Sequence, residues 1–213
     1  MGIYKVFVFL FLLISGPAFA GICPAGPAGT LDTVLLMNGS KIAGVVGDTS
    51  NHHFKVTYLK KSGKSKTISL EEDLVFSILY KDGHEQVVYQ QDTATGNYFT
   101  AEETRFFIYG EQDAEKNYHC PGVVISSFAI GVGGAYLGSF LSFIPPFAYS
   151  GLLLIPKIKI KYKTVSNPVY LNYDTYVLGY EKVGRRKKLF RSLISGISGM
   201  AIGFAGFQLL LPN

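Results

Sequence analysis

The side chains best able to bind a metal ion or to transfer a proton near neutral pH are the four histidines of this 213-residue chain. A metal site needs several ligands that face one point. Adjacent His52 and His53 would point to opposite faces of a strand, and His84 and His119 lie far from them in the sequence. The sequence therefore predicts no metal site. It also lacks a nucleophile elbow, a P-loop and a dinucleotide fingerprint, so we expect no cofactor and no enzyme activity.

Paired carboxylates are the second group that could do chemistry, as a general acid and base. Glu111, Asp113 and Glu115 follow Glu102 and Glu103 within one predicted helix. Carboxylates at this spacing are also typical of a solvated helix face, and we expect that interpretation to hold. An enzyme with an unrecognised site is therefore the weaker hypothesis.

The two cysteines could form a disulfide. Cys23 and Cys120 bracket the region that we expect to be exported, and a bridge is chemically permitted outside the cytoplasm. Closing a loop of that length would stabilise the fold by about 4 to 5 kcal/mol in the chain-entropy model. The alternatives are two unpaired thiols, or a lipidated Cys23, although Ile22 stands where a lipoprotein signal has a small residue.

The first 20 residues, MGIYKVFVFLFLLISGPAFA, have the pattern of a secretory signal peptide. Lys5 gives a short positive region, residues 6–14 form the apolar core, and Ala18 and Ala20 supply the small residues of a cleavage site. We expect cleavage after Ala20 and export of the residues that follow.

Charge is divided unevenly along the chain. Residues 21–119 hold nine Lys or Arg and thirteen Asp or Glu, a net charge of −4. Residues 157–191 hold ten Lys or Arg and two acidic residues, a net charge of +8. With 48% hydrophobic and only 16% charged residues overall, this distribution favours a membrane protein over a nucleic-acid-binding protein.

Two long stretches are apolar enough to be transmembrane helices. Residues 122–144 are 23 largely apolar residues and residues 192–211 are 20, and a helix needs about 20 to cross a bilayer. Between them, residues 147–155 are apolar but too few to cross. We interpret these as a re-entrant or interfacial segment that completes residues 121–156.

The positive-inside bias then gives an expected topology. A single crossing over residues 121–156 would leave the exported region outside and residues 157–191 in the cytoplasm, and residues 192–213 would return the C-terminus to the outside. We expect the cations before the second helix to hold its end among lipid headgroups, with roughly 1 kcal/mol from each near anionic lipid. These cations are Arg185, Arg186, Lys187, Lys188 and Arg191.

Small residues recur at every fourth position in both apolar stretches, which places them in stripes along a helix face. In lipid, helices associate by close approach at such residues. We expect the two helices to pack on each other through these stripes, and self-association through the same stripes is the alternative. The residues are Ser127, Gly131, Gly133, Gly134 and Gly138 in the first stretch and Ser195, Gly199 and Gly203 in the second.

The exported region has the pattern of a small antiparallel β structure. Six short β-rich runs alternate with turn residues over residues 33–89, and Asn38-Gly39 and Asp82-Gly83 are typical of tight hairpin turns. The spacing predicts an SH3-like or Sm-like β-barrel module within residues 21–98.

A capping box at Thr100 and Glu103 then predicts a membrane-proximal helix within residues 99–120. The string FIYGEQDAEKNYH in this helix and the later string YVLGYEKVGRRKKLF share an aromatic-apolar lead, a glycine (Gly110 and Gly179) and a charged run. The two strings indicate either a degenerate internal repeat or a chance similarity.

Five strings are spread over the mature chain between residues 35 and 199: LLMNGSKIAGVV, VTYLKK, ISLEEDLVFSILYKDGHEQVVY, YGEQDAEKNY and GYEKVGRRKKLFRSLISGISG. They resemble strings in small exported membrane proteins of Bacteroidota, a family without an assigned activity. The resemblance implies a barrel-like β module followed by transmembrane helices. It implies no functional residue.

Together these features predict an α+β membrane protein with a cleaved signal peptide, a small antiparallel β-barrel module and two transmembrane helices. We expect a non-enzymatic cell-envelope protein of the cytoplasmic membrane that presents the β module on the exported side as a binding or scaffold subunit. A small oligomeric channel or transport accessory is the alternative. The expected partners are the lipid bilayer and another envelope protein or a second copy of the chain, and not nucleic acid.

Overall fold

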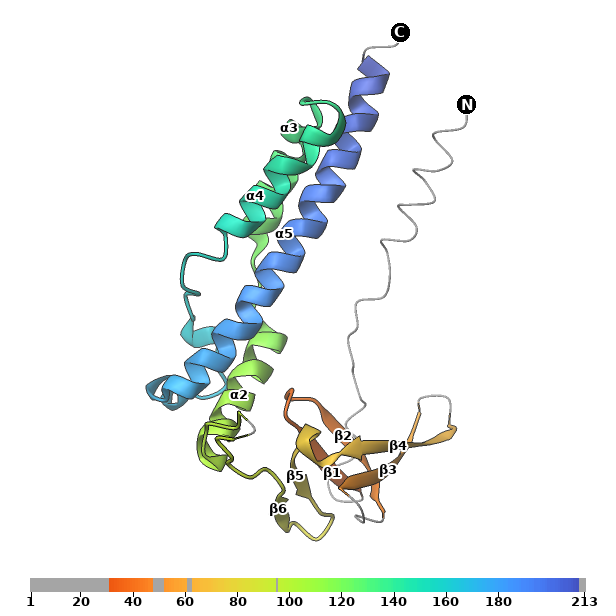
Figure 1. Ribbon diagram of the computed structural model, residues 1–213, viewed down its shortest axis with the longest axis vertical. Coiled ribbons are helices and arrows are strands. Elements are labelled where there is room, and N and C mark those ends of the chain that lie inside the picture. The colour runs from red at the N-terminus through yellow and green to blue at the C-terminus, as the bar shows by residue number, and fades with distance from the viewer. Residues whose placement is uncertain (1–30, 48–51, 61–62, 95, 211–213) are drawn as a thin grey trace. The chain divides into compact units, whose positions relative to one another are not determined.

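The structure is a computed structural model that describes residues 31–47, 52–60, 63–94 and 96–210. The chain divides into two compact units (Figure 1). Unit 1 contains residues 40–86 and the strand before them, and unit 2 contains residues 37–39 and the chain from residue 87 onward. The predicted signal peptide and Cys23 lie outside the described residues.

Unit 1 is one antiparallel sheet of six strands, in the order β4-β3-β2-β1-β5-β6. Its core includes Val34, Val56 and Ile78, which are fully shielded from solvent. The strands are β1 (Asp32–Leu36), β2 (Lys41–Val46), β3 (His53–Leu59), β4 (Ser65–Glu71), β5 (Val75–Leu79) and β6 (Glu85–Val87), with a 3₁₀ turn, Glu72–Leu74, between β4 and β5. The six predicted strands are confirmed.

Both predicted hairpins are also present. β1 pairs with β2 across Asn38-Gly39, and β5 pairs with β6 across Asp82-Gly83. Gly39 has a φ of +79° and Gly83 a φ of +87°, a left-handed conformation that glycine adopts without a steric cost. The carboxylate of Asp82 also accepts a hydrogen bond from the backbone N–H of His84 (2.9 Å), which fixes the second turn.

The predicted barrel is wrong, because the sheet is open. Closure would require the two edge strands, β4 and β6, to pair with each other, and no such pairing occurs among the described strands. β6 has only three residues, all of them exposed, so it offers a short edge. β2 pairs with β3 at Val45 with Thr57 and at Val46 with Val56, and the backbone N–H of Gly47 donates to the carbonyl oxygen of Lys55 (2.8 Å).

Unit 2 is helical. Its helices are α2 (Ala101–Asn117), α3 (Pro121–Ala135), α4 (Ile144–Leu152) and α5 (Asp174–Leu210), with 3₁₀ turns at Ser139–Phe143, Tyr162–Thr164 and Pro168–Asn172. α5 has 37 residues and is about 55 Å long. α2 lies beside its first half, and α3 and α4 lie beside its second half (Figure 1).

The predicted capping box fixes the start of α2. The Glu103 carboxylate accepts a hydrogen bond from the backbone N–H of Thr100 (2.8 Å), and the Thr100 hydroxyl accepts one from the backbone N–H of Glu103 (3.2 Å). Backbone amides at a helix start have no partner within the helix, so these bonds stabilise it. The backbone bond, followed by the bond from the Thr100 hydroxyl, holds the pKa of Glu103 below its ordinary value.

The first predicted transmembrane helix, residues 122–144, is wrong. α3 ends at Ala135 after 15 residues, a length of about 22 Å against a hydrocarbon core of about 30 Å. The chain turns at Gly138, which has a φ of +67°, and returns along α4, which begins with Pro145 and Pro146 in its first turn. α3 and α4 therefore form a helical hairpin.

One candidate span remains among the described helices. α5 is long and apolar enough to cross a membrane over Asp174–Gly206. The second predicted transmembrane helix, residues 192–211, thus corresponds to the C-terminal half of a longer helix.

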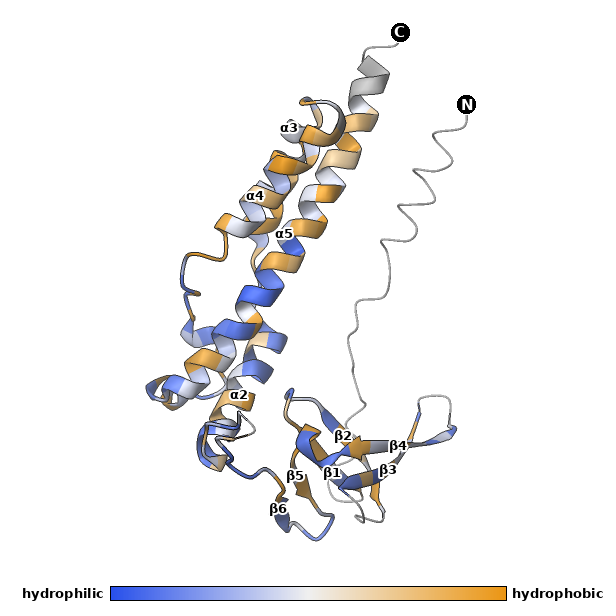
Figure 2. Ribbon diagram, in the orientation of Figure 1, coloured by the Kyte–Doolittle hydropathy of each residue, from blue (hydrophilic) through white to orange (hydrophobic). Residues whose placement is uncertain are grey.

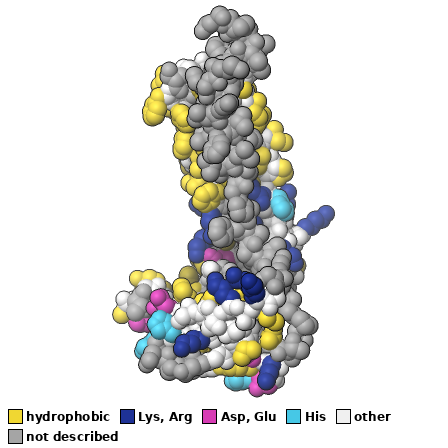
Figure 3. Space-filling view, turned by 90° about the vertical axis from the view of Figure 1, so that its right-hand side faces the viewer, with side chains coloured by type: hydrophobic (Ala, Val, Ile, Leu, Met, Phe, Trp, Pro, Cys, Tyr) yellow, Lys and Arg dark blue, Asp and Glu magenta, His cyan; other side chains and the backbone are white. Residues whose placement is uncertain are grey.

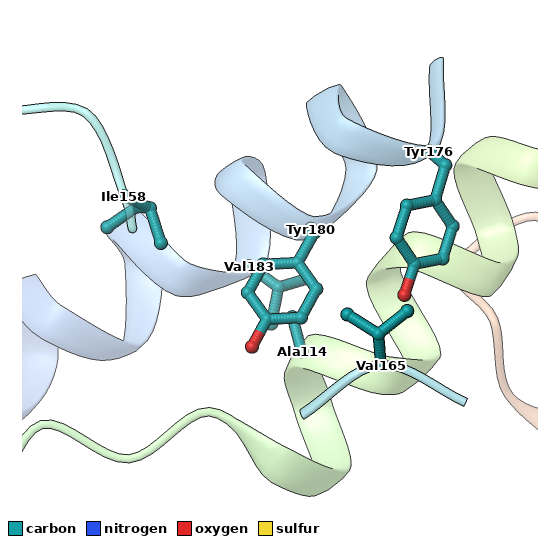
Figure 4. Close-up of a cluster of buried hydrophobic side chains, with 6 residues drawn as sticks. All are labelled: Ala114, Ile158, Val165, Tyr176, Tyr180 and Val183. Atoms are coloured by element: carbon teal, nitrogen blue, oxygen red, sulfur yellow. The ribbon is translucent and has the colours of Figure 1, made fainter. Parts of the chain in front are cut away.

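Unit 2 has two parts along α5, which we name the head and the apolar bundle. The head consists of α2, residues 156–173 and residues 174–191 of α5. The apolar bundle consists of α3, α4 and the rest of α5. Six side chains from the three segments of the head form its core (Figure 4): Ala114, Ile158, Val165, Tyr176, Tyr180 and Val183.

The capping box gives a first prediction. We expect Thr100→Ala to destabilise the start of α2 by about 1 kcal/mol, measured as faster hydrogen exchange of the backbone amides of residues 101–104. A carboxyl whose pKa is lowered by folding contributes stability above its ordinary pKa, and this contribution is lost as the pH falls through the lowered value. As the pH is lowered, hydrogen exchange of these amides in the wild type should therefore approach the exchange in Thr100→Ala at the same pH. Thr100→Ser keeps the cap, and equal exchange in both variants would contradict the prediction.

Candidate functional site

α3 and α5 approach each other so closely that their backbones touch. A methyl group on Gly131 would overlap the carbonyl oxygen of Gly196, and one on Gly199 would overlap the carbonyl oxygen of Phe128. The contact is reciprocal, because each helix supplies a glycine that faces a carbonyl group of the other. Any side chain at either position would force the helices apart.

The other small residues of the predicted stripes have different surroundings. Gly203 extends the contact between α5 and α3, and Gly134 faces the 3₁₀ turn that follows α3. A methyl group on Gly133 or Gly138 would meet no atom within 4 Å. The stripes are therefore only partly used in packing within the chain.

Serine hydroxyls join the three helices of the apolar bundle. The hydroxyl of Ser192 on α5 lies 2.8 Å from that of Ser127 on α3 and 2.7 Å from that of Ser150 on α4. Ser195 donates to the carbonyl oxygen of Val124 (2.6 Å). All four serines are buried, so these bonds satisfy polar groups that have no access to water. Ser150 and Ser192 were not predicted as contact residues, although serine in an apolar stretch is a signal for contact between helices.

A second reciprocal glycine contact joins α2 to α5 in the head. A methyl group on Gly110 would overlap the carbonyl oxygen of Tyr176, and one on Gly179 would overlap that of Phe107. These are the glycines of the two similar strings in the sequence. The two strings therefore pack on each other at the residue they share.

A buried aspartate ties the three segments of the head together. Asp113 on α2 accepts hydrogen bonds from the hydroxyl of Tyr176 on α5 (2.6 Å), from the backbone N–H of Ser166 (2.8 Å) and from the Ser166 hydroxyl. Asp113 is 6% exposed and Glu111 is 5% exposed, so the predicted solvated face is wrong for these two carboxylates. The partners of Asp113 lie 63 and 53 residues away in the sequence, where a helix pattern does not show them.

Three of the five predicted headgroup cations form ion pairs inside the head. Arg185 lies 3.1 Å from Glu181 on the same helix. Arg186 and Lys187 lie 3.3 and 3.6 Å from Glu115 on α2. Their charges are therefore partly neutralised by carboxylates of the protein itself.

The ion pairs of the head also overturn the predicted separation of residues 99–120 from residues 157–191 by a membrane crossing. Lys182 and Glu111, one from each segment, lie 2.8 Å apart. Contact at this distance leaves no room for a bilayer between the two segments. The prediction failed because the α3–α4 hairpin returns where a crossing was expected.

Among the described residues, Cys120 and the histidines are not gathered into a site. Cys120 is buried next to the start of α3, and its predicted partner Cys23 lies outside the described residues, so the bridge stays a prediction. His52 lies 2.7 Å from Glu72 at an exposed position. Within the part of the chain that the structure describes, no three His, Cys, Asp or Glu side chains come together as possible metal ligands.

Comparison of the chain with protein-family models, with curated proteins and with solved structures finds no match. Its function must therefore be inferred from the fold and from the contacts described above. Those contacts hold the helices and charged segments of unit 2 together.

Gly131 and Gly133 give a matched test of the close approach, because both lie in α3 and only Gly131 faces α5. We expect Gly131→Ala to lower the thermal unfolding temperature of the detergent-solubilised chain, since overpacking at such a contact costs about 1 to 3 kcal/mol. Gly133→Ala should leave it unchanged or raise it, because alanine is favoured over glycine in a helix by up to about 1 kcal/mol. An equal loss in the two variants would exclude the backbone contact.

Proposed function

We propose that the protein is a non-enzymatic membrane subunit, anchored by α5 and the α3–α4 hairpin, that carries unit 1 as a binding or scaffold module. The main support is the distribution of side chains in the apolar bundle, which has polar groups inside and apolar groups outside. Buried serine hydroxyls join its helices, and large apolar side chains are exposed on it. Most residues of its helices are hydrophobic (Figure 2), and hydrophobic side chains are visible on this part of the molecule where it is not drawn in grey (Figure 3). Exposed examples are Ile125, Phe128, Phe147, Ile194 and Ile202.

A lipid environment explains this distribution of polar and apolar side chains better than water does. Soluble monomeric proteins rarely expose a large contiguous apolar surface. In a bilayer, large apolar side chains face acyl chains, and helices associate through small residues and hydroxyl groups. Residues 117–156, which include the whole hairpin, contain no Asp, Glu, Lys or Arg. A re-entrant hairpin beside a single crossing helix fits this composition.

The ion pairs support a topology in which the whole head lies on one side of the bilayer and the C-terminus on the other. Two sequence signals disagree about the side. A signal peptide at residues 1–20 would export the head, whereas the ten cations of residues 157–191 favour the cytoplasm. We assign unit 1 and the head to the exported side of the cytoplasmic membrane, because the first hydrophobic segment usually dominates orientation.

An oligomeric channel has less support as an alternative. Gly131, Gly199 and Gly203, which such an assembly would need, already make contacts within the chain. Residues 122–155 contain no charged side chain that would mark an ion path. We therefore expect unit 1, and not the glycine stripes, to contact a partner, either another envelope protein or a second copy of the chain.

Single cysteines at Glu102 and Asn172 test the topology, because both positions are exposed and lie in different segments of the head. The two native cysteines are first replaced by serine. A thiol reagent that does not cross membranes should label both positions in intact cells and should not label a cysteine at position 213. Labelling of only one of the two head positions would contradict a single crossing. Labelling at position 213 alone would place the head in the cytoplasm.

Crosslinking of intact cells tests the binding role of unit 1. The exposed lysines Lys55, Lys66 and Lys81 belong to unit 1 and carry amines that an impermeant crosslinker can reach. We expect a partner to be crosslinked to at least one of them, identified by mass spectrometry of the joined peptides. Replacement of all three by arginine keeps their charge and should abolish these crosslinks. A partner joined only through lysines of the head would argue against unit 1 as the binding module.

A further inference from the structure

The segment that follows α4 reads PKIKIKYK over residues 156–163. Its last two residues belong to the 3₁₀ turn Tyr162–Thr164. Ile158 is buried in the head core, and its side chain lies against Gly184 of α5. The lysines between the apolar residues are exposed, and we name them the lysine ladder: Lys157, Lys159, Lys161 and Lys163.

The lysine ladder holds positive charge that the head does not neutralise. The head, taken as residues 101–117 and 156–191, contains twelve Lys or Arg and seven Asp or Glu, which leaves a net charge of +5. Three of its acidic residues pair with cations of α5: Glu111, Glu115 and Glu181. Among the described residues, no carboxylate pairs with a ladder lysine, or with Lys188 or Arg191.

The ladder begins at the end of the head that adjoins the apolar bundle. Arg185 donates to the carbonyl oxygen of Leu154, just before the ladder (3.4 Å). Ile158 lies at the level of Gly184, eight residues or about 12 Å before Ser192 along α5. Lysine side chains extend along a surface to place their ammonium groups in the polar layer, which is about 5 to 7 Å thick on each side of the bilayer.

The other end of the ladder lies farther from the bundle. The hydroxyl of Thr164, the residue after Lys163, accepts a hydrogen bond from the hydroxyl of Tyr180 (2.7 Å). Tyr180 lies four residues before Gly184, about 6 Å farther along α5. Lys157 and Lys159 are therefore closer to the expected bilayer than Lys161 and Lys163.

The residues just before the ladder indicate what kind of anion it meets. Leu152 is 62% exposed and Ile155 is 75% exposed, and Lys157 follows two residues later. The same short segment thus presents an apolar surface and then a cationic one. A lipid matches both, because its acyl chain covers the apolar part and its phosphate approaches the cations. A nucleic acid would match only the second part.

We propose that Lys157 and Lys159, together with Lys188 and Arg191, bind the phosphate groups of anionic lipids at the membrane surface. This inference rests on the proposed function, because it requires α5 to cross a bilayer. It adds to the sequence cluster at residues 185–188 a headgroup contact in the segment that follows α4.

The test compares two double variants of the full chain in vesicles that mix phosphatidylcholine and phosphatidylglycerol at physiological salt. Lys157→Gln with Lys159→Gln removes the two cations near the bilayer, and Lys161→Gln with Lys163→Gln removes the same charge farther away. The readout is the ratio of the two lipids that stay bound to the purified chain, counted by native mass spectrometry. Thermal unfolding of each variant checks that it is folded.

We expect the first variant to lower the preference for phosphatidylglycerol about 25-fold, since each lysine near the surface contributes about fivefold. The second variant should change it by less than about threefold, because salt screens charges beyond about 8 Å. Equal losses in the two variants, or no preference in the wild type, would overturn the proposal. The proposal would also be overturned if free inorganic phosphate competed for the chain as well as phosphatidylglycerol does. Binding of a short RNA in place of the lipid would overturn it as well.

Flotation of the chain with the vesicles separates the two proposals. A chain that does not float contradicts the membrane anchor and therefore the proposed function. A chain that floats but shows no preference for phosphatidylglycerol contradicts only the role of the lysine ladder.

Discussion

The fold of unit 2 depends on the close backbone approach between α5 and the helices that lie along it. Gly110 and Gly179 provide that approach in the head, and Gly131 and Gly199 provide it in the apolar bundle. Where backbones touch, short polar side chains on the two helices can reach each other. The hydrogen bonds at Ser192 need this distance, because a serine hydroxyl extends only a little beyond the helix surface. Larger residues at the glycine positions would separate the helices and leave these hydroxyls buried without partners.

The same backbone contact serves two different environments along one helix. In the head, it brings Asp113 against donors from two other segments, so that a buried carboxylate is stabilised by hydrogen bonds. In the apolar bundle, it brings hydroxyl groups together and leaves large apolar side chains on the outside. The change occurs within one residue of α5, since Arg191 is its last cation and Ser192 is its first buried serine. This position marks where we expect the membrane surface to meet the helix.

Features set by neighbouring residues could be predicted from the sequence. The turn at Asn38-Gly39 and the cap at Thr100 depend on residues a few positions apart, and both are present. Barrel closure could not be predicted, because it depends on whether the distant strands β4 and β6 are long enough to pair. The length of α3 was missed for a different reason. An apolar stretch gives a high hydropathy whether it crosses or turns, and the turn is made by the backbone conformation of Gly138.

The cations show most clearly why site residues cannot be identified from the sequence without the fold. Arg186 and Lys187 belong to the densest cationic cluster in the sequence, which made them the natural headgroup anchors. Both pair with Glu115, a residue on α2 more than 70 positions earlier, so the fold reduces the charge available to a lipid. The lysines of residues 157–163 are separated by apolar residues, but all four are exposed, and none of them pairs with a carboxylate among the described residues. The number of cations in a segment therefore says less about its partner than the carboxylates that the fold places beside it.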